Sequence, residues 1–191
     1  MPACLVVQPI HESGLALLAS RGVTPIAATG IDADTLVREM RQADAVIVRT
    51  EPIPPRAIEA AERLRVIAKH GVGFDNIPVP VATLHGIVVV YTPGANARSA
   101  AEQAIALMFA VAKRVPSADR AQRNSEWRFR YEPGLVELHG KTLGVIGFGT
   151  IGRFVAEIAA RGLGMRVIVF SPRADDSSIV AIGATRAITL D

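Results

Sequence analysis

The chain of 191 residues is 50% hydrophobic and 20% charged, which gives enough apolar surface for one large domain or two small ones. Its 21 basic and 18 acidic residues give a formal net charge of +3, but the basic residues form no long run and only 5% of residues are aromatic, so nucleic-acid binding is not expected. No run of about 18 apolar residues predicts a membrane span, the N-terminus lacks a signal-peptide pattern, and a single cysteine excludes an intrachain disulfide, so we expect a cytoplasmic protein.

Residues 3–96 alternate short apolar runs with amphipathic stretches. The runs expected to form buried parallel strands are residues 4–7, 23–27, 45–48, 66–68 and 88–90. The stretches expected to form helices are residues 14–20, 33–41, 55–63 and 80–85. Strands that alternate with helices in this way predict an α/β domain with a flavodoxin-like, doubly wound parallel sheet covered on both faces. Cys4 lies in the first run and is expected to be a buried structural thiol.

The loops after the strands are the expected ligand site, because ligands of such sheets bind beyond the carboxyl ends of the strands. Arg49 and Thr50 follow the third strand, and residues 69–76 follow the fourth. In the second of these loops, Gly71 and Gly73 flank a turn whose backbone N–H groups are suited to hold a carboxylate, with the Arg49 guanidinium as a bidentate clamp. The sequence therefore predicts an anion site at this edge of the sheet.

Other residues of the second loop have more ordinary interpretations. Asp75 and Asn76 precede an apolar helix, and a capping role alone would explain both. His70 has no carboxylate beside it in the sequence to orient its ring, so we interpret it as a residue that lines the pocket rather than as a general base.

Residues 99–123 form the longest helical pattern of the chain, with Ser99 and Glu102 as a capping box at its start. The next segment, residues 124–133, is polar and interleaves aromatic residues with arginines. Because aromatic residues and arginine are enriched at protein interfaces, this segment is predicted to be the arm of a homodimer. The alternative is a loop folded over its own domain.

The most informative pattern is a strand followed by a glycine motif, a helix and a second strand. Residues 142–146 are the first strand, a G-x-G-x-x-G motif follows, and residues 165–170 are the second strand. Gly147 is expected to make the tight turn, Gly149 to let the backbone approach a pyrophosphate, and Gly152 to let helix and strand pack closely. Since the helix N-terminus would face the phosphates, the pattern predicts dinucleotide binding.

The end of the second strand indicates which dinucleotide binds. Ser171 stands where an acidic residue usually binds the adenine ribose 2′-OH, and Arg173 follows closely. A hydroxyl beside a guanidinium accepts a 2′-phosphate, whereas a carboxylate repels it, so we expect NADP rather than NAD. The alternatives are that Asp175 or Asp176 reaches back to the ribose, or that Arg173 is a solvated surface charge.

Three segments carry a family resemblance: VIAKHGVGFDNI (residues 66–77), TPGANARSAAEQAIALMFAVAKR (residues 92–114) and KTLGVIGFGTIGR (residues 141–153). Together they resemble the D-isomer-specific 2-hydroxyacid dehydrogenases, most of all the D-3-phosphoglycerate dehydrogenases and the hydroxypyruvate or glyoxylate reductases. The resemblance implies an NAD(P)-dependent homodimeric oxidoreductase that interconverts a small D-2-hydroxy acid and its 2-keto acid. It also implies that residues 1–96 are a substrate-binding domain lacking its C-terminal helix, and that residues 97–191 are the first half of a Rossmann nucleotide-binding domain.

The resemblance also assigns roles to individual residues. Those assigned to the substrate are Arg49, Thr50, the backbone N–H groups of Val72 and Gly73, and Asn96 at the cleft between domains. Those assigned to the cofactor, beside the motif glycines, are Thr150 and Ile151 at the pyrophosphate and Ser171 at the ribose. Val72 replaces the Thr of many phosphoglycerate dehydrogenases, and Ser171 replaces the Asp typical of NAD-dependent members.

The Arg, Glu and His that carry out catalysis in the family are expected beyond Asp191, so no catalytic residue is assigned to this chain, and no metal site is expected. The chain by itself is therefore not expected to catalyse hydride transfer. Two alternatives to the enzyme are a non-catalytic fragment and a dinucleotide-sensing binding protein.

Overall fold

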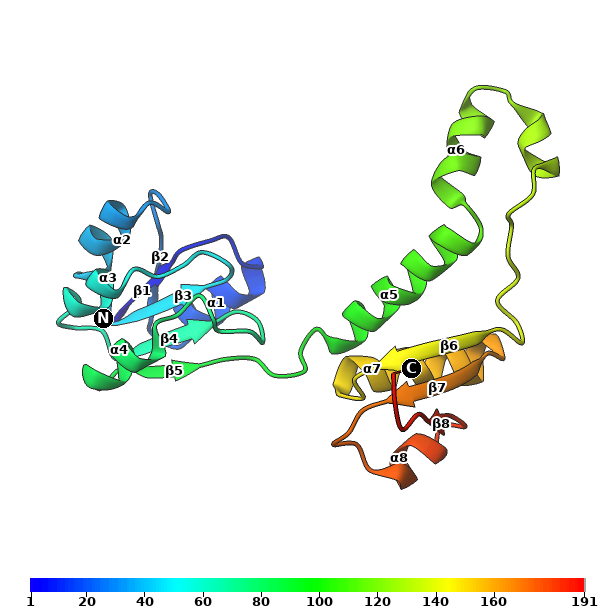
Figure 1. The fold of residues 1–191 in the computed structure, drawn as a ribbon. Helices are drawn as coiled ribbons and strands as arrows, with labels where there is room; N and C mark the ends of the chain where they lie inside the picture. Colours follow the sequence, from blue (N-terminus) through cyan, green and yellow to red (C-terminus); the bar gives the residue numbers. More distant parts are fainter. Residues whose placement is uncertain (191) are drawn as a thin grey trace. The chain divides into compact units, whose positions relative to one another are not determined.

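The computed structural model describes residues 1–190, and the chain divides into two compact units, Met1–Ala95 and Asn96–Asp191. Each unit has its own parallel sheet and its own cluster of buried apolar side chains (Figure 1). The sequence placed the boundary between a substrate-binding and a nucleotide-binding domain after residue 96, and the functions of the two units stay predictions. No helix among residues 1–190 is both long and apolar enough to cross a bilayer.

The first unit is a five-stranded parallel sheet with helices between successive strands. Its strands are β1 (Ala3–Val6), β2 (Thr24–Ala27), β3 (Ala45–Val48), β4 (Val66–Lys69) and β5 (Val88–Val90), in the order β2-β1-β3-β4-β5. Its helices are α1 (Glu12–Ser20), α2 (Ala33–Met40), α3 (Pro55–Glu59) and α4 (Val79–Leu84). This is the strand order of the flavodoxin-like sheet, so the predicted α/β fold is confirmed.

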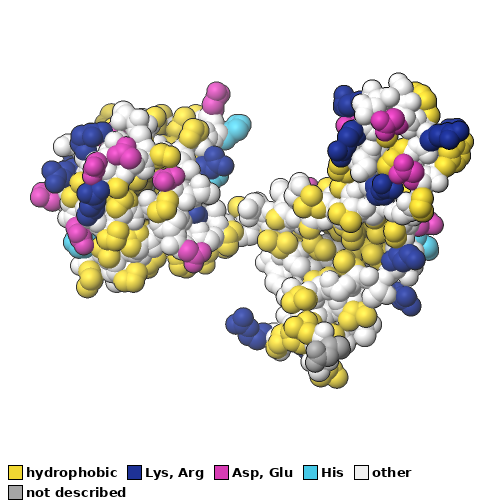
Figure 2. Space-filling model, turned by 45° about the horizontal axis from the view of Figure 1, so that its top comes forward, with side chains coloured by type: hydrophobic (Ala, Val, Ile, Leu, Met, Phe, Trp, Pro, Cys, Tyr) yellow, Lys and Arg dark blue, Asp and Glu magenta, His cyan; other side chains and the backbone are white. Residues whose placement is uncertain are grey.

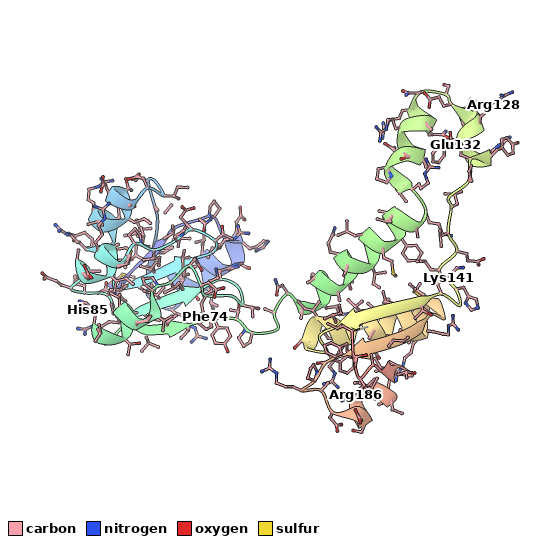
Figure 3. All side chains as sticks on the ribbon, in the orientation of Figure 1. Phe74, His85, Arg128, Glu132, Lys141 and Arg186 are labelled. Atoms are coloured by element: carbon pink, nitrogen blue, oxygen red, sulfur yellow. The ribbon has the colours of Figure 1, made fainter. Side chains whose placement is uncertain are left out.

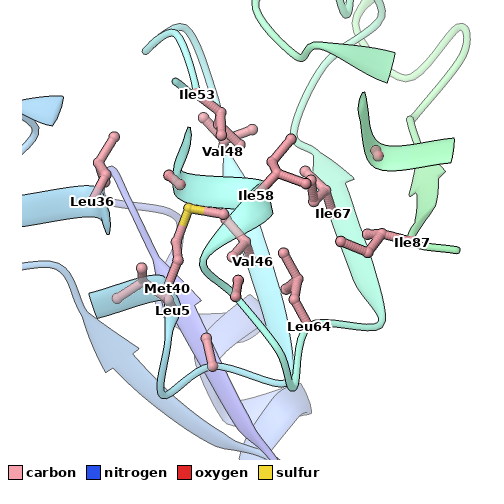
Figure 4. Close-up of a cluster of buried hydrophobic side chains, with 14 of the residues drawn as sticks. Leu5, Leu36, Met40, Val46, Val48, Ile53, Ile58, Leu64, Ile67 and Ile87 are labelled. Atoms are coloured by element: carbon pink, nitrogen blue, oxygen red, sulfur yellow. The ribbon is translucent and has the colours of Figure 1, made fainter. Parts of the chain in front are cut away.

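The core of the first unit lies on one face of this sheet (Figure 4). Val46 of β3 and Ile67 of β4 are fully buried at its centre. Leu36 and Met40 of α2 and Ile58 of α3 pack against them. Buried and less buried residues alternate along β3 and β4, because successive side chains of a strand point to opposite faces of the sheet. The larger apolar side chains of both strands therefore point toward these helices.

The opposite face of the sheet, which was also expected to be covered, is closed at β1, where Cys4 and Val6 are buried, and open at β5. Helices α2, α3 and α4 all contribute their buried apolar residues to the single core cluster. Val88 and Val90 of β5 point to the other face, where they are 58% and 43% exposed. Cys4 is buried in β1, and burial raises the pKa of its thiol, which confirms the predicted buried thiol.

The second unit begins with helices and continues with a small parallel sheet. The first elements are α5 (Ala97–Ala112), α6 (Val115–Arg123) and the 3-10 helix η1 (Trp127–Tyr131). They are followed by β6 (Thr142–Ile146), α7 (Thr150–Glu157), the π-helical turn η2 (Ile158–Gly162), β7 (Arg166–Phe170), α8 (Asp176–Val180) and β8 (Thr185–Arg186). The sheet order is β6-β7-β8. The predicted order of strand, glycine motif, helix and strand is confirmed.

The long helical pattern over residues 99–123 is interrupted, which corrects the expectation of one helix. Arg114, between α5 and α6, has a left-handed backbone with φ of 49°. A helix that continued through Pro116 would lose a backbone hydrogen bond and would clash with the preceding turn. The chain therefore changes direction just before this proline.

The predicted capping box is also wrong. Helix α5 begins at Ala97, and no side chain caps it, so Ser99 lies inside the first turn instead of before it. Glu102 forms an ion pair one turn back, with Arg98 at 3.7 Å. Because the helix starts earlier than the pattern suggested, the two residues of the box cannot reach the free N–H groups that they would cap.

Candidate functional site

The loop after β3 is held by Gln8, a residue that the sequence analysis did not select. Gln8 Oε1 accepts hydrogen bonds from the backbone N–H groups of Arg49, Thr50 and Glu51, at 3.0, 2.8 and 3.1 Å. Its Nε2 donates to Thr50 Oγ1 at 2.9 Å. Because the Thr50 hydroxyl accepts this bond, its own proton stays available for an acceptor outside the protein. The sequence signal was a polar residue just past β1, which pairs with β3.

Lys69, the last residue of β4, and Asn76, in the loop that follows, hold the same loop. Lys69 is 8% exposed, and its Nζ donates to the Arg49 carbonyl and, at 2.8 Å, to Asn76 Oδ1. Asn76 Nδ2 donates to the Glu51 carbonyl at 2.7 Å. The Arg49 guanidinium is itself held by the Pro9 carbonyl at 2.9 Å. No carboxylate among residues 1–190 pairs with Lys69, so its charge is not neutralised by the protein.

The capping role considered for Asp75 and Asn76 is wrong. Helix α4 begins at Val79, and the residue that precedes it is Pro78, without a capping side chain. Asn76 instead connects the ends of β3 and β4 through its side-chain amide. Only the arrangement of neighbouring strands shows this role.

The turn after β4 leaves backbone N–H groups open at the same edge of the sheet. Gly71 has φ of 146°, and its N–H donates to Thr92 Oγ1 at 3.1 Å. Within the described chain, no protein acceptor pairs with the N–H groups of Val72 or Gly73. Phe74, labelled in Figure 3, is 42% exposed and packs beside the Tyr91 ring at 5.5 Å between centroids.

The structure thus places four of the predicted substrate residues on two adjacent loops of the first unit. Arg49 and Thr50 follow β3, and Val72 and Gly73 follow β4, its neighbour in the sheet. Asn96 lies outside this unit, as the residue that precedes α5 in the second one. His70 extends the same loop, and its N–H donates to the Val48 carbonyl at 2.8 Å.

Two positions of the glycine motif in the second unit require glycine because of the backbone geometry there. Gly147 has φ of 91°, and its N–H donates to the Phe170 carbonyl at 2.8 Å, which ties the turn to β7. A Cβ on Gly152 would lie 2.2 Å from the Gly147 carbonyl oxygen, so helix α7 crosses this turn at backbone contact. A Cβ on Gly149 would meet nothing within 4 Å. The turn is therefore closed on the side of Gly152 and open on the side of Gly149.

The start of α7 faces this open space. Thr150 and Ile151 are its first residues, and no side chain caps their N–H groups. A groove of about 530 Å³ adjoins the turn and is lined by residues that include Gly149, Thr150 and Arg153. The Arg153 guanidinium lies 5.6 Å from the Phe148 ring centroid. Arg153, which the sequence analysis passed over, adds a positive charge beside the helix N-terminus, where anions are favoured.

The loop after β7 is held by Arg186 of β8, which was also not selected from the sequence. Its guanidinium donates to the carbonyls of Ser171 and Ala174, each at 2.8 Å, and pairs with Asp176 at 2.7 Å. Figure 3 labels Arg186 beside this loop. One oxygen of the exposed Asp176 carboxylate is therefore engaged by Arg186.

The second acidic residue of this loop is also engaged. Asp175 accepts hydrogen bonds from Ser177 Oγ and, at 3.2 Å, from the Ser178 N–H, and so caps α8. These bonds lower the pKa of the Asp175 carboxyl. In the described chain, Arg173 is exposed and forms no ion pair, and the Ser171 hydroxyl has no protein partner.

The chain contains four histidines, and within residues 1–190 none pairs with a carboxylate. The same part of the chain has no group of three or more His, Cys, Asp or Glu side chains placed to hold a metal ion.

Comparison with known proteins places this chain in a family. The family model for the D-isomer specific 2-hydroxyacid dehydrogenase, catalytic domain, matches residues 4–189. The chain belongs to this family. The resemblance inferred from the sequence is thereby confirmed.

Two dehydrogenase-family relatives show how much of a longer protein this chain matches. The D-3-phosphoglycerate dehydrogenase of Archaeoglobus fulgidus is 40% identical over 169 residues, which cover 88% of this chain and 32% of that protein. The glyoxylate reductase of Korarchaeum cryptofilum is 39% identical over 139 residues, covering 71% of this chain and 42% of that protein. The chain thus spans about a third of the length of the phosphoglycerate dehydrogenases that it matches.

Solved structures of 2-hydroxyacid dehydrogenases have the same fold. A structure from Polaromonas, described as a D-isomer specific 2-hydroxyacid dehydrogenase, NAD-binding, matches with a TM-score of 0.89 at 27% identity and covers 100% of this chain and 61% of that one. The apo D-lactate dehydrogenase of Escherichia coli matches with a TM-score of 0.80 at 23% identity, over 98% and 60% of the two chains. At this identity the second match shows the fold alone.

Proposed function

We propose that this chain provides the substrate-binding domain and the first half of the nucleotide-binding domain of an NAD(P)-dependent oxidoreductase, which interconverts a small D-2-hydroxy acid and its 2-keto acid. The observation that carries the proposal is the backbone contact between Gly152 and Gly147, which leaves the turn at Gly149 open in front of α7. Family membership supports it, because the matched relatives are named for reactions of 2-hydroxy or 2-keto acids.

The substrate proposal rests on the charges and open donors of the first unit. The N–H groups of Val72 and Gly73 would bind the carboxylate, and the Thr50 hydroxyl would donate to a second oxygen of the substrate. Arg49 and the unpaired charge of Lys69 favour an anionic molecule. This set of donors suits 3-phosphoglycerate, hydroxypyruvate or glyoxylate. Asn96 stays a candidate contact on the evidence of the resemblance alone.

The cofactor proposal rests on the second unit. When bound, the nicotinamide cofactor would supply the hydride for reduction of the keto carbon. The N-terminus of α7, with Thr150 and Ile151, would bind the pyrophosphate. Because Asp176 is paired and Asp175 caps α8, Ser171 and Arg173 are the groups left to bind the ribose end, which favours NADP over NAD. The NAD-binding description of the Polaromonas structure supports the binding of a nicotinamide dinucleotide.

We also propose a homodimer formed through the segment after α6. Trp127 and Tyr131 are 61% and 74% exposed, and apolar side chains gather on the surface of this unit (Figure 2). The middle of the segment contacts its own unit, since the Arg114 guanidinium lies 4.9 Å from the Phe129 ring centroid in η1. A cytoplasmic location is proposed with it, because the single cysteine is buried and reduced thiols are typical of that compartment.

The 191-residue chain alone is proposed to bind dinucleotide without turning it over. In the family, a His–Glu dyad gives the proton to the carbonyl oxygen, and no histidine of residues 1–190 has a carboxylate partner. The second candidate is a non-catalytic role, such as that of a dinucleotide-sensing binding protein. The absence of a histidine–carboxylate pair in residues 1–190 favours this candidate.

Titration of the purified chain with NADPH and NADH, followed by nucleotide fluorescence, tests the binding proposal. We expect saturable binding of at least one nucleotide, and no loss of absorbance at 340 nm when hydroxypyruvate or glyoxylate is added. Absence of binding would contradict the site at Gly147–Gly152. Turnover would show instead that the catalytic groups lie within this chain.

Gln8→Glu is expected to weaken 2-keto acid binding by about tenfold or more, because a hydrogen bond to a charged group contributes about 1.5–3 kcal/mol. The glutamate would still accept the backbone N–H groups, but the Thr50 hydroxyl would now donate to it and would be lost to the substrate. Calorimetric titration with hydroxypyruvate measures the change. Gln42→Glu, which adds the same charge at an exposed position, is the matched control, and an equal loss in both variants would refute the role of Gln8.

A further inference from the structure

The loop from Ser171 to Asp176 contains one arginine and two carboxylates. Its preference between the ribose 2′-OH of NAD and the 2′-phosphate of NADP therefore depends on which of these charges is free. Strand β8 pairs in parallel with β7, with Arg186 opposite Val169, and this register brings the Arg186 side chain alongside the loop. The side chain is 26% exposed, and its fork makes hydrogen bonds to two carbonyls and one carboxylate.

The carbonyl bonds fix the backbone of the loop at two points. Arg186 donates to the Ser171 carbonyl at the end of β7 and to the Ala174 carbonyl just before α8. Residues 172 and 173 therefore form a short bridge between two anchored positions. The Ser171 hydroxyl, at the first anchor, and the Arg173 guanidinium, in the bridge, have no protein partner in residues 1–190.

The ion pair removes the carboxylate that would act against a phosphate. A free Asp176 carboxylate could accept hydrogen bonds from a ribose diol and would repel a 2′-phosphate. The Arg186 guanidinium lies 2.7 Å from Asp176 Oδ1 and offsets part of this negative charge, while the Asp176 side chain stays 72% exposed. Asp175 Oδ2 is held at the N-terminus of α8, so each acid has one carboxylate oxygen engaged by the protein.

We propose that Arg186 is a positioning residue that determines cofactor specificity: by anchoring Ser171 and Ala174 and pairing with Asp176, it holds the loop in the form that accepts the 2′-phosphate of NADPH. The inference rests on the proposed function, because it concerns the same dinucleotide site. Arg186 acts through the loop, since its guanidinium donates to the protein acceptors of that loop.

The test compares the ratio of dissociation constants for NADH and NADPH in the whole 191-residue chain and in Arg186→Leu. We expect the unaltered chain to prefer NADPH, and the variant to lose about tenfold or more of that preference, mainly through weaker NADPH binding. The ratio of dissociation constants for AMP and adenosine 2′,5′-bisphosphate should change in the same way, because only the bisphosphate carries the 2′-phosphate. Adding Asp176→Asn to Arg186→Leu should restore part of the preference, since it removes the freed charge.

Arg161→Leu is the matched control. Arg161 also pairs with a carboxylate, Glu157 at 2.9 Å, and donates to a carbonyl, that of Ala181 at 2.8 Å, but it does not touch the loop. Its loss should leave the nucleotide ratio unchanged. If Arg186→Leu does not fold, Arg186→Lys keeps the charge and loses the planar fork, and a smaller fall in the ratio is expected.

An unchanged ratio in the Arg186 variants, with both nucleotides still bound, would overturn this inference and leave the proposed function intact. A preference of the unaltered chain for NADH would also overturn it. Failure of the unaltered chain to bind either nucleotide would overturn the proposed function, and the inference with it.

Discussion

Gly152→Ala is expected to destabilise the second unit by roughly 1–3 kcal/mol or more and to abolish dinucleotide binding. The new Cβ would lie 2.2 Å from the Gly147 carbonyl oxygen, and the obstacle is backbone, which no side-chain rotation can move away. Helix α7 must then shift away from β6, and the turn that faces the groove changes shape. Urea denaturation followed by the fluorescence of Trp127 measures the stability, and NADPH titration measures binding.

Gly149→Ala separates the effect of Gly152→Ala on stability from its effect on dinucleotide binding. Its Cβ meets nothing within 4 Å, and its backbone angles of −75° and −170° suit alanine, so stability should be unchanged. The Cβ would occupy the space proposed for the pyrophosphate, so NADPH affinity should still fall. Gly144→Ala in β6, which also has open space, should change neither property. A Gly152→Ala variant with native stability and affinity would contradict the close contact of helix and turn.

Ile67→Ala is expected to destabilise the first unit by about 2–5 kcal/mol, the usual cost of removing a large side chain from a closed core. Ile67 is 0% exposed and lies among Val46, Ile58 and other apolar side chains (Figure 4). Far-ultraviolet circular dichroism during urea denaturation measures the shift. Leu84→Ala, at a position that is 84% exposed, is the control and should change stability little.

Ile67→Ala also tests whether the two units unfold independently of each other. The single tryptophan, Trp127, lies in the second unit, which has its own buried cluster. Its fluorescence transition and the NADPH affinity are therefore expected not to move in Ile67→Ala. An equal shift of both transitions would contradict two independent cores.

Local patterns in the sequence were sufficient for most of the fold. The strands of the first unit were predicted to within one residue, because buried parallel strands are continuous apolar runs between turn residues. The role of Gly152 in the close packing of helix and strand was also predictable, since it depends on a motif of neighbouring residues. The helix break at Arg114 was not predicted, although Pro116 is a residue that commonly interrupts a helix.

The residues that organise the site could not be found in this way. Gln8 contacts a loop more than forty positions away, and Arg186 contacts Ser171 fifteen positions away, so both depend on which strands are neighbours in the sheet. Asn76 looked like a helix cap because it precedes α4, but its amide joins β3 to β4. Sequence patterns located the loops that we propose to face the ligands, and the strand order was needed to see what holds them.

The most direct test of the central proposal is an amide nitrogen–proton NMR spectrum of the labelled chain during titration with NADPH. We predict that the signals of Gly149, Thr150 and Ile151, together with those of Ser171 and Arg173, shift most and saturate. Shifts confined to other parts of the chain, or no shifts at millimolar nucleotide, would contradict the assignment of the second unit as a dinucleotide-binding domain.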